Sequence, residues 1–236
     1  MDKLHENIYF YIDESYKKEG FLGIAVVVLI GDVNIKITND MLSSVSKDLL
    51  FKHRNKGSGE IHYADNNLGP KINVIDKIYQ MPISAYLSYK KQEVTSLSKQ
   101  EMDKIVYTEL LPELLEKVAK KYVKNFKERP ITINLQFEQL SDKKGKDLKF
   151  FTECISELGF NFNPHVVGKD DIFTALPDYF LGLLGKLIID TTKDSAKNEM
   201  EMVEGKIGLV VNATDSKRQY YARGDEIRMF IKNTPT

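Results

Sequence analysis

The sequence predicts an α/β protein built on a mixed sheet, with an antiparallel three-strand opening and flanking helices. Two observations support this prediction. Short aromatic and β-branched runs follow one another over residues 8–37, and from residue 39 onward helical patterns alternate with strand-like runs. Such an order is typical of a sheet that is antiparallel at one edge and parallel elsewhere.

Three strands are predicted in the opening segment, at 8–12, 21–29 and 33–37. The first is rich in aromatic and β-branched residues and ends at the polar triplet Asp13-Glu14-Ser15. Gly31-Asp32 is a turn signal between the second strand and the third. The three strands are therefore expected to form an antiparallel meander.

In the rest of the chain, apolar residues three or four positions apart predict helices, and β-branched clusters predict strands. The helices are expected over 39–52, 70–79, 98–123, 146–158 and 175–189. The strands are expected over 83–89, 131–137, 165–167, 206–211 and 227–231. Asn39 and Ser98 are predicted N-caps. The layout suits a ribonuclease H-like fold over 1–191, with a C-terminal extension, 192–236, that we expect to form a hairpin packed on the same domain.

Acidic residues stand where two predicted strands end. Asp13 follows the first strand and Glu138 follows strand 131–137, and ligands are usually bound at the carboxyl ends of strands in α/β sheets. The simpler interpretation is that both are solvent-facing exit residues, and Asp142 or Asp147 could take the place of Glu138. The strand ends alone leave these alternatives open.

Two further segments carry candidate side chains. Glu60 and His62 follow a glycine-rich loop at 55–59 and could act as ligands or as an acid and a base, although an isolated Glu-x-His is more often not functional. Asp178 is the one acidic residue in the first turns of the apolar helix 175–189, where burial is costly unless the carboxylate is paired. It could equally stabilise the positive end of the helix dipole.

Gly182 and Gly185 share a helix face with Asp178. Because glycine has no side chain, such a face can approach a sheet closely and bring the carboxylate toward the strands. The alternative is that the glycines serve only tight packing.

Together these side chains predict a site for divalent metal. Clustered carboxylates repel one another without a cation, and oxygen ligands suit Mg²⁺ or Mn²⁺. A pair of such ions cleaves phosphodiesters without a serine or cysteine nucleophile. The predicted catalytic residues are Asp13, Glu60, Glu138, Asp178 and His62, with His62 assisting proton transfer.

The bulk composition limits the partners. Lys plus Arg and Asp plus Glu each number 34, so a nucleic-acid surface has to be local. We predict such contacts at the lysines nearest Glu138, which are Lys143, Lys144, Lys146 and Lys149. Cys154 is the single cysteine, so no disulfide framework is expected. The first residues lack a signal-peptide pattern, and the apolar run 21–30 is shorter than the ~20 residues of a membrane span. We therefore expect a cytoplasmic protein with no membrane partner.

Four strings occur in the order found in a known family: YFYIDES, GEIHYAD, INLQFEQLS and ALPDYFLGLLGKLI. Over 9–190 the chain resembles the domain-of-unknown-function family 3800, which occurs in bacteria, phages and mobile elements. The resemblance implies a ribonuclease H-like nuclease, in a setting such as antiviral defence. It assigns motif positions, and so metal ligands, to Asp13, Glu14, Glu60 and Asp178, beside Glu138.

The chain departs from the family pattern in two places. Glu138 stands where an aspartate is usual, and Leu176-Pro177-Asp178 lacks the usual Gln and Ala. Mg²⁺ needs near-octahedral placement, so these changes bear on activity. Two functions follow: a metal-dependent nuclease acting on DNA or RNA, or a catalytically silent module that binds a protein partner through the extension 192–236.

Overall fold

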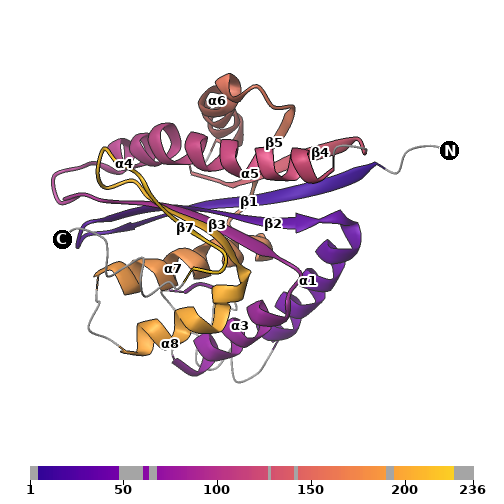
Figure 1. Cartoon of the computed structure of the whole chain (residues 1–236), viewed down its shortest axis with the longest axis horizontal. Helices are drawn as coiled ribbons and strands as arrows, with labels where there is room; N and C mark the ends of the chain where they lie inside the picture. Colours follow the sequence, from indigo (N-terminus) through magenta and orange to yellow (C-terminus); the bar gives the residue numbers. More distant parts are fainter. Residues whose placement is uncertain are drawn as a thin grey trace.

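The structure is a computed structural model that describes residues 5–47, 61–63, 68–126, 129–140, 143–189 and 194–225. Within these ranges it is one seven-stranded sheet with helices on both faces (Figure 1). Glu60, the glycine-rich loop 55–59 and the predicted strand 227–231 lie outside the described residues.

The sheet has the strand order β5-β4-β1-β2-β3-β6-β7. The strands are β1 (Glu6–Lys17), β2 (Phe21–Ile30), β3 (Ser84–Lys91), β4 (Ile131–Glu138), β5 (Phe162–Val167), β6 (Ile207–Asn212) and β7 (Gln219–Ala222). β1, β2 and β3 pair antiparallel, whereas β1 with β4, β4 with β5 and β3 with β6 pair parallel. The predicted mixed sheet with an antiparallel three-strand opening is confirmed.

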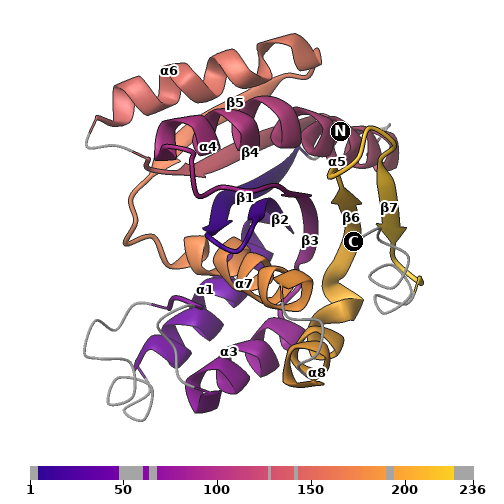
Figure 2. The same ribbon diagram turned by 90° about the vertical axis from the view of Figure 1, so that its left-hand side faces the viewer.

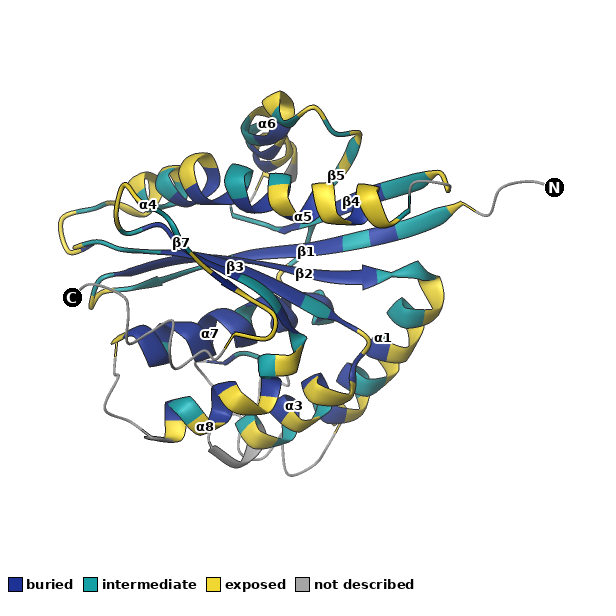
Figure 3. Cartoon of the chain, in the orientation of Figure 1, coloured by how far each residue is buried: buried dark blue, intermediate teal, exposed yellow. Residues whose placement is uncertain are grey.

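The described helices divide between the two faces of the sheet (Figures 1 and 2). On one face lie α1 (Gly31–Lys47), α3 (Leu68–Gln80), α7 (Ala175–Ile189) and α8 (Asp194–Val203). On the other lie α4 (Lys99–Ile105), a π-helical turn (Val106–Leu110), α5 (Leu111–Asn125) and α6 (Lys144–Ile155). We call these the α7 face and the α5 face. Each covers its own apolar core, and the central strand β2 between them is buried over nearly its whole length (Figure 3).

The strand predicted at 33–37 is wrong, because the chain there is the first part of α1. Gly31 has a φ of +77°, which turns the chain out of β2 at a conformation that residues with a Cβ rarely adopt. The buried residues of α1 are Thr38, Leu42 and Val45, which have helical spacing. Asn39 is therefore inside the helix and not its N-cap, and β3 is the third strand of the opening.

The other predicted helices are present. Ser98 begins α4 with a capping box: its side chain accepts the Glu101 N–H, and the Glu101 carboxylate accepts the Ser98 N–H at 2.7 Å. The predicted helix 98–123 is α4, the π-helical turn and α5 in succession. Within the described residues, one stretch, Ile172–Ile189, is apolar and long enough to cross a membrane, but 78% of it is buried inside the protein. Its apolarity is thus explained by packing on β1 and β2.

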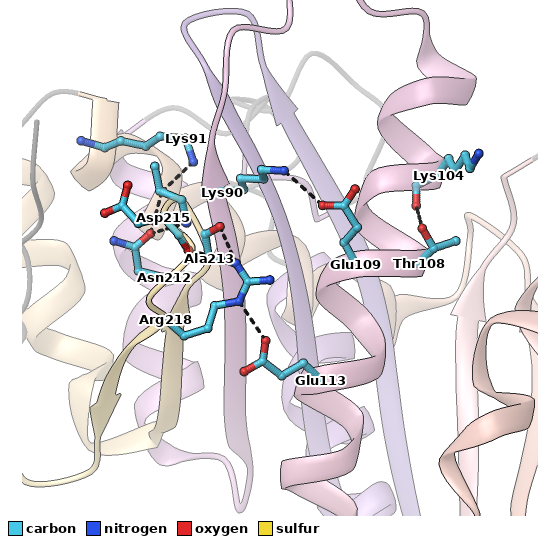
Figure 4. Close-up of polar contacts among 11 residues, drawn as sticks. Lys90, Lys91, Lys104, Thr108, Glu109, Glu113, Asn212, Ala213, Asp215 and Arg218 are labelled. Atoms are coloured by element: carbon cyan, nitrogen blue, oxygen red, sulfur yellow. Dashed lines mark hydrogen bonds and ion pairs between the residues drawn. The ribbon is translucent and has the colours of Figure 1, made fainter.

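The C-terminal extension forms a helix and a hairpin that continue the sheet. β6 lies where a strand was predicted at 206–211, and its antiparallel partner is β7. Arg218 fastens the hairpin to α5: its Nε donates to Glu113 Oε2 at 3.2 Å, and its Nη1 donates to the Ala213 carbonyl at 2.8 Å (Figure 4). The extension is thereby joined to both β3 and α5.

Candidate functional site

Asp13 lies within β1 with its side chain on the α7 face. Side chains alternate along a strand. Ile12 belongs to the core of the α5 face and Tyr11 to the core of the α7 face, so Asp13 points to the same side as Tyr11. It is only 8% exposed, and its Oδ1 accepts the Glu14 N–H at 2.8 Å.

Glu138 ends β4 beside Asp13. Ile12 pairs with Phe137 in the parallel register, so the next residue on each strand is its neighbour across the ladder. Phe137 packs in the core of the α5 face, which puts Glu138 on the α7 face. The carboxylates of Asp13, inside β1, and Glu138, at the end of β4, therefore share one face of the sheet.

Asp178 comes to the same place from the first turn of α7. Its Oδ2 accepts the Tyr63 backbone N–H at 2.6 Å and lies 3.7 Å from His62 Nδ1. A cavity of about 120 Å³ adjoins this group, lined in part by His62, Lys169 and Thr174. The structure thus gathers Asp13, Glu138, Asp178 and His62 at one end of α7.

The electrostatics of the group are those of crowded carboxylates. Burial raises the pKa of Asp13 well above its ordinary value, and the charges of Glu14, Glu138 and Asp178 raise it further. Burial also raises the pKa of Glu138, with Asp178 adding to the rise, whereas Lys169 and His62 oppose it. A cation placed among these oxygens would instead lower the pKa values of Asp13 and Glu138.

The donor set suits a hard divalent cation, because its members are carboxylates held in a mainly buried setting. The described residues hold no group of three or more His, Cys, Asp or Glu side chains arranged to bind a metal ion. The predicted ligand Glu60 lies outside them. Asp13, Glu138 and Asp178 would be the ligands, after a change of side-chain conformation.

Glu14 does not join this group. Its side chain lies on the α5 face, where Tyr107 Oη donates to Glu14 Oε2 at 2.5 Å. Nearby, Tyr16 Oη donates to Asp103 Oδ1 at 2.6 Å. Burial raises the pKa of Glu14 to about 7, although the Tyr107 hydrogen bond lowers it. The period of two along a strand separates Asp13 from Glu14, so the expectation that both bind one metal is not met.

The lysines predicted to contact nucleic acid stand at the N-cap and in the first two turns of α6, on the α5 face and away from Asp13 and Asp178. They are Lys143, Lys144, Lys146 and Lys149. Lys146 lines a hollow with residues of α4, and Lys149 lies 3.9 Å from Glu153. Asp147, the alternative to Glu138, accepts the Leu140 N–H at 3.0 Å on the same side. Because α6 packs on the α5 face, these predicted contacts lie across the sheet from Asp13 and Asp178, and they stay a prediction.

Two residues near the site were missed from the sequence. Lys169 follows β5, and its positive charge lowers the pKa of Glu138. Tyr63 donates its N–H to Asp178, and its ring packs edge-on against Tyr179 at 5.5 Å. The Tyr63 ring occupies the space beside Gly182, so this glycine makes room for the tyrosine. Of the two glycines, it is Gly185 that faces the sheet, where it lies next to Phe21. Tyr63 follows His62 directly, and that adjacency was the available signal.

No protein-family model and no curated protein matches the chain. Solved structures similar to it include ribonuclease H2 from Pyrococcus horikoshii OT3, with 13% identity, 82% of this chain and 75% of that chain covered, and a TM-score of 0.37. A second is a PCNA:RNase HII complex from Archaeoglobus fulgidus, with 10% identity, 85% of this chain and 75% of that chain covered, and a TM-score of 0.35. A third is a mutant of Bst-RNase HIII, with 11% identity, 83% of this chain and 54% of that chain covered, and a TM-score of 0.39. The predicted α/β class, a mixed sheet with flanking helices, is confirmed by the sheet topology itself.

Proposed function

We propose that the protein is a divalent-metal-dependent nuclease that cleaves phosphodiester bonds in DNA or RNA. One observation supports this above the others: the buried Asp13 of β1 meets the carboxylates of Glu138, from β4, and Asp178, from α7, at one place on the sheet. Such an arrangement is unfavourable in an empty protein and favourable around a cation. Mg²⁺ or Mn²⁺ fits these oxygens.

The residues would have separate roles. Asp13 and Glu138 are fixed by neighbouring strands and would hold the metal from the sheet. Asp178 would hold it from α7, oriented by the Tyr63 N–H. When bound, the metal would activate water and stabilise the leaving oxygen. His62 would carry the proton, since its Nδ1 already faces the Asp178 carboxylate.

The test is calorimetric titration of Mn²⁺ into the wild type, Asp13→Asn and Asp178→Asn. Exposed Asp76, which accepts only a long 3.4 Å hydrogen bond from Gln80 among the bonds found, supplies the matched control Asp76→Asn. We expect metal binding in the wild type and the control and its loss in the two site variants. Labelled single- and double-stranded DNA and RNA then report cleavage. Equal binding or equal cleavage in all four proteins would refute the proposal.

The finer assignment is also a proposal. We propose membership of the domain-of-unknown-function family 3800, a role in antiviral defence or in a mobile element, and a cytoplasmic site of action. Its support is the four strings together with the meeting of Asp13, Asp178 and His62 in space. Plaque counts on cells expressing the wild type or Asp13→Asn test the defence role, and equal counts would contradict it.

A silent partner-binding module is the second candidate. It is favoured by the finding that the described residues hold no assembled group of metal ligands. The extension would then supply the binding surface through its hairpin, where Tyr220 is 48% exposed. Absence of Mn²⁺ binding by the wild type, with assembly into a larger complex on co-expression of a neighbouring gene product, would support it over the nuclease.

A further inference from the structure

Three lysines come together farther along the α7 face, beyond Asp178. Lys71, from α3, lies 4.0 Å from the centre of the Tyr63 ring. Lys17 ends β1, and its Cε lies 3.6 Å from the position that a Cβ on Gly185 would occupy. Lys186 is the next residue of α7. We call Lys17, Lys71 and Lys186 the lysine cluster.

The positive charge of this cluster exceeds the negative charge beside it. Glu199 is only 5% exposed. Its Oε1 accepts a hydrogen bond from Lys186 Nζ at 2.7 Å, and its Oε2 accepts one from Tyr63 Oη at 3.2 Å. Both of its oxygens are thus engaged. The ion pairs found between described residues include neither Lys17 nor Lys71. Within the described part of the chain, Lys71 therefore has the Tyr63 ring but no acidic partner, and Lys17 has no acidic partner either.

Lys71 is also partly buried among like charges. Burial lowers its pKa, and Lys186 and Lys17 lower it further, while Glu199 and Asp178 raise it. Like charges at such range repel one another, and an anion between them removes the repulsion. A phosphate group is an anion of suitable charge and accepts several N–H donors.

The lysine cluster lies a few nucleotide lengths from the proposed reaction centre. Lys186 follows Asp178 by eight positions, which is about 12 Å along a helix axis at ~1.5 Å per residue. That distance is roughly three to four nucleotides at about 3.4 Å per step of one strand. Lys169 lies at the carboxylate end, where it lowers the pKa of Glu138 and lines the cavity beside His62. A strand could therefore run from Lys169 across the carboxylates to the cluster.

We propose that Lys17 and Lys71, with Lys186 held by Glu199, bind the phosphate backbone of the nucleic-acid strand that is cut at Asp13, Glu138 and Asp178. The proposal rests on the nuclease function and adds the path of its substrate. An acidic protein segment would be a weaker fit, because it would bring no phosphodiester bond to the carboxylates where the proposed cleavage takes place. The path is an alternative to the contacts predicted from the sequence at the α6 lysines.

The experiment measures binding without cleavage. Fluorescence anisotropy of a labelled 20-nucleotide single strand, and of its duplex, is recorded in EDTA over a range of salt concentrations. The variants are Lys17→Gln/Lys71→Gln and, with the same charge change, Lys146→Gln/Lys149→Gln on α6. Lys186 is left intact because its removal would strand the buried Glu199. Thermal unfolding confirms that both variants are folded.

Two lost phosphate contacts reduce the slope of log K against log salt by about 1.4 for the single strand or about 1.8 for the duplex, and weaken single-strand binding roughly 25-fold at about 0.1 M salt. We expect this for Lys17→Gln/Lys71→Gln and little change for the α6 variant. Equal losses in both variants, a loss confined to the α6 variant, or no binding by the wild type would overturn the inference. Cluster-dependent binding by a wild type that neither binds Mn²⁺ nor cleaves would refute the nuclease and leave the phosphate site standing.

Discussion

Gly182→Ala tests how tightly Tyr63 is held against α7. An ideal Cβ at Gly182 would overlap Cγ and Cδ1 of the Tyr63 ring, whereas one at Gly185 would lie 3.4 Å from Phe21 Cε1, an ordinary contact. The Tyr63 ring is itself fixed by Tyr179 and by the hydrogen bond to Glu199. It therefore has little room to yield.

The expected change in the free energy of unfolding combines two destabilising effects and one stabilising effect. Overpacking costs about 1–3 kcal/mol, and movement of Tyr63 weakens a hydrogen bond to the Asp178 carboxylate worth about 1.5–3 kcal/mol. Replacing a helical glycine by alanine returns about 1 kcal/mol. Gly182→Ala should therefore lower the free energy of unfolding by about 2 kcal/mol, or roughly 4–8 °C in Tm for a chain of this size. Gly185→Ala, on the same helix, should raise it by up to about 1 kcal/mol.

Urea unfolding of both variants measures the difference. Tyr63→Ala completes a double-mutant cycle: removal of the ring should relieve much of the Gly182→Ala loss, although the Tyr63 Cβ would still lie 2.8 Å from the new methyl. Equal effects at Gly182 and Gly185, or additivity with Tyr63→Ala, would show that Tyr63 is not wedged against the helix as described.

Three further predictions concern the α5 face. Burial raises the pKa of Glu14 from 4.5 to about 7, so the stability that its protonated carboxyl contributes is present below pH 4.5 and is lost as pH rises through about 7. In Glu14→Gln, the free energy of unfolding measured from pH 4 to 8 should fall less with pH than in the wild type. Ser98→Ala removes the capping box with Glu101 and should cost about 1 kcal/mol in urea unfolding. Arg218→Met frees the hairpin from Glu113 and should speed amide hydrogen exchange in β6 and β7, with unchanged exchange contradicting the clamp.

The sequence predicted those parts of the fold whose local signal agrees with the tertiary structure. The capping box at Ser98 and the apolar run of 175–189 are of this kind. The segment 33–37 misled because Val33 and Ile37 suggest a strand, yet both are exposed. Its helix is recognised from Thr38, Leu42 and Val45 farther along, so a window of five residues could not decide between the two structures.

The site was predictable to the extent that strand ends and helix starts define it. Glu138 and Asp178 each stand at such a boundary, whereas Asp13 lies inside β1, which continues to Lys17; the fold brings the three to one face. The position of Glu14 was not predictable from a strand taken to end at residue 12; β1 continues to Lys17, and its period of two turns Glu14 to the other face. Nor was the lysine cluster predictable, because Lys17, Lys71 and Lys186 come from three elements far apart in the chain.

The silent module and the nuclease differ in what they require of Asp13. The Asp13 carboxylate accepts one backbone N–H, a role that an asparagine oxygen fills without charge. Burial raises the Asp13 pKa, so the wild type loses stability as pH rises through that value, and Asp13→Asn should be the more stable protein in EDTA at neutral pH. Under the nuclease proposal the order reverses with metal, since ligand at 100 times Kd adds about 2.7 kcal/mol to the wild type alone. Unfolding curves with EDTA and with Mn²⁺ should therefore cross over between the two proteins. If Asp13→Asn remains the more stable protein in both conditions, the carboxylate has no metal to hold and the silent module is the better account.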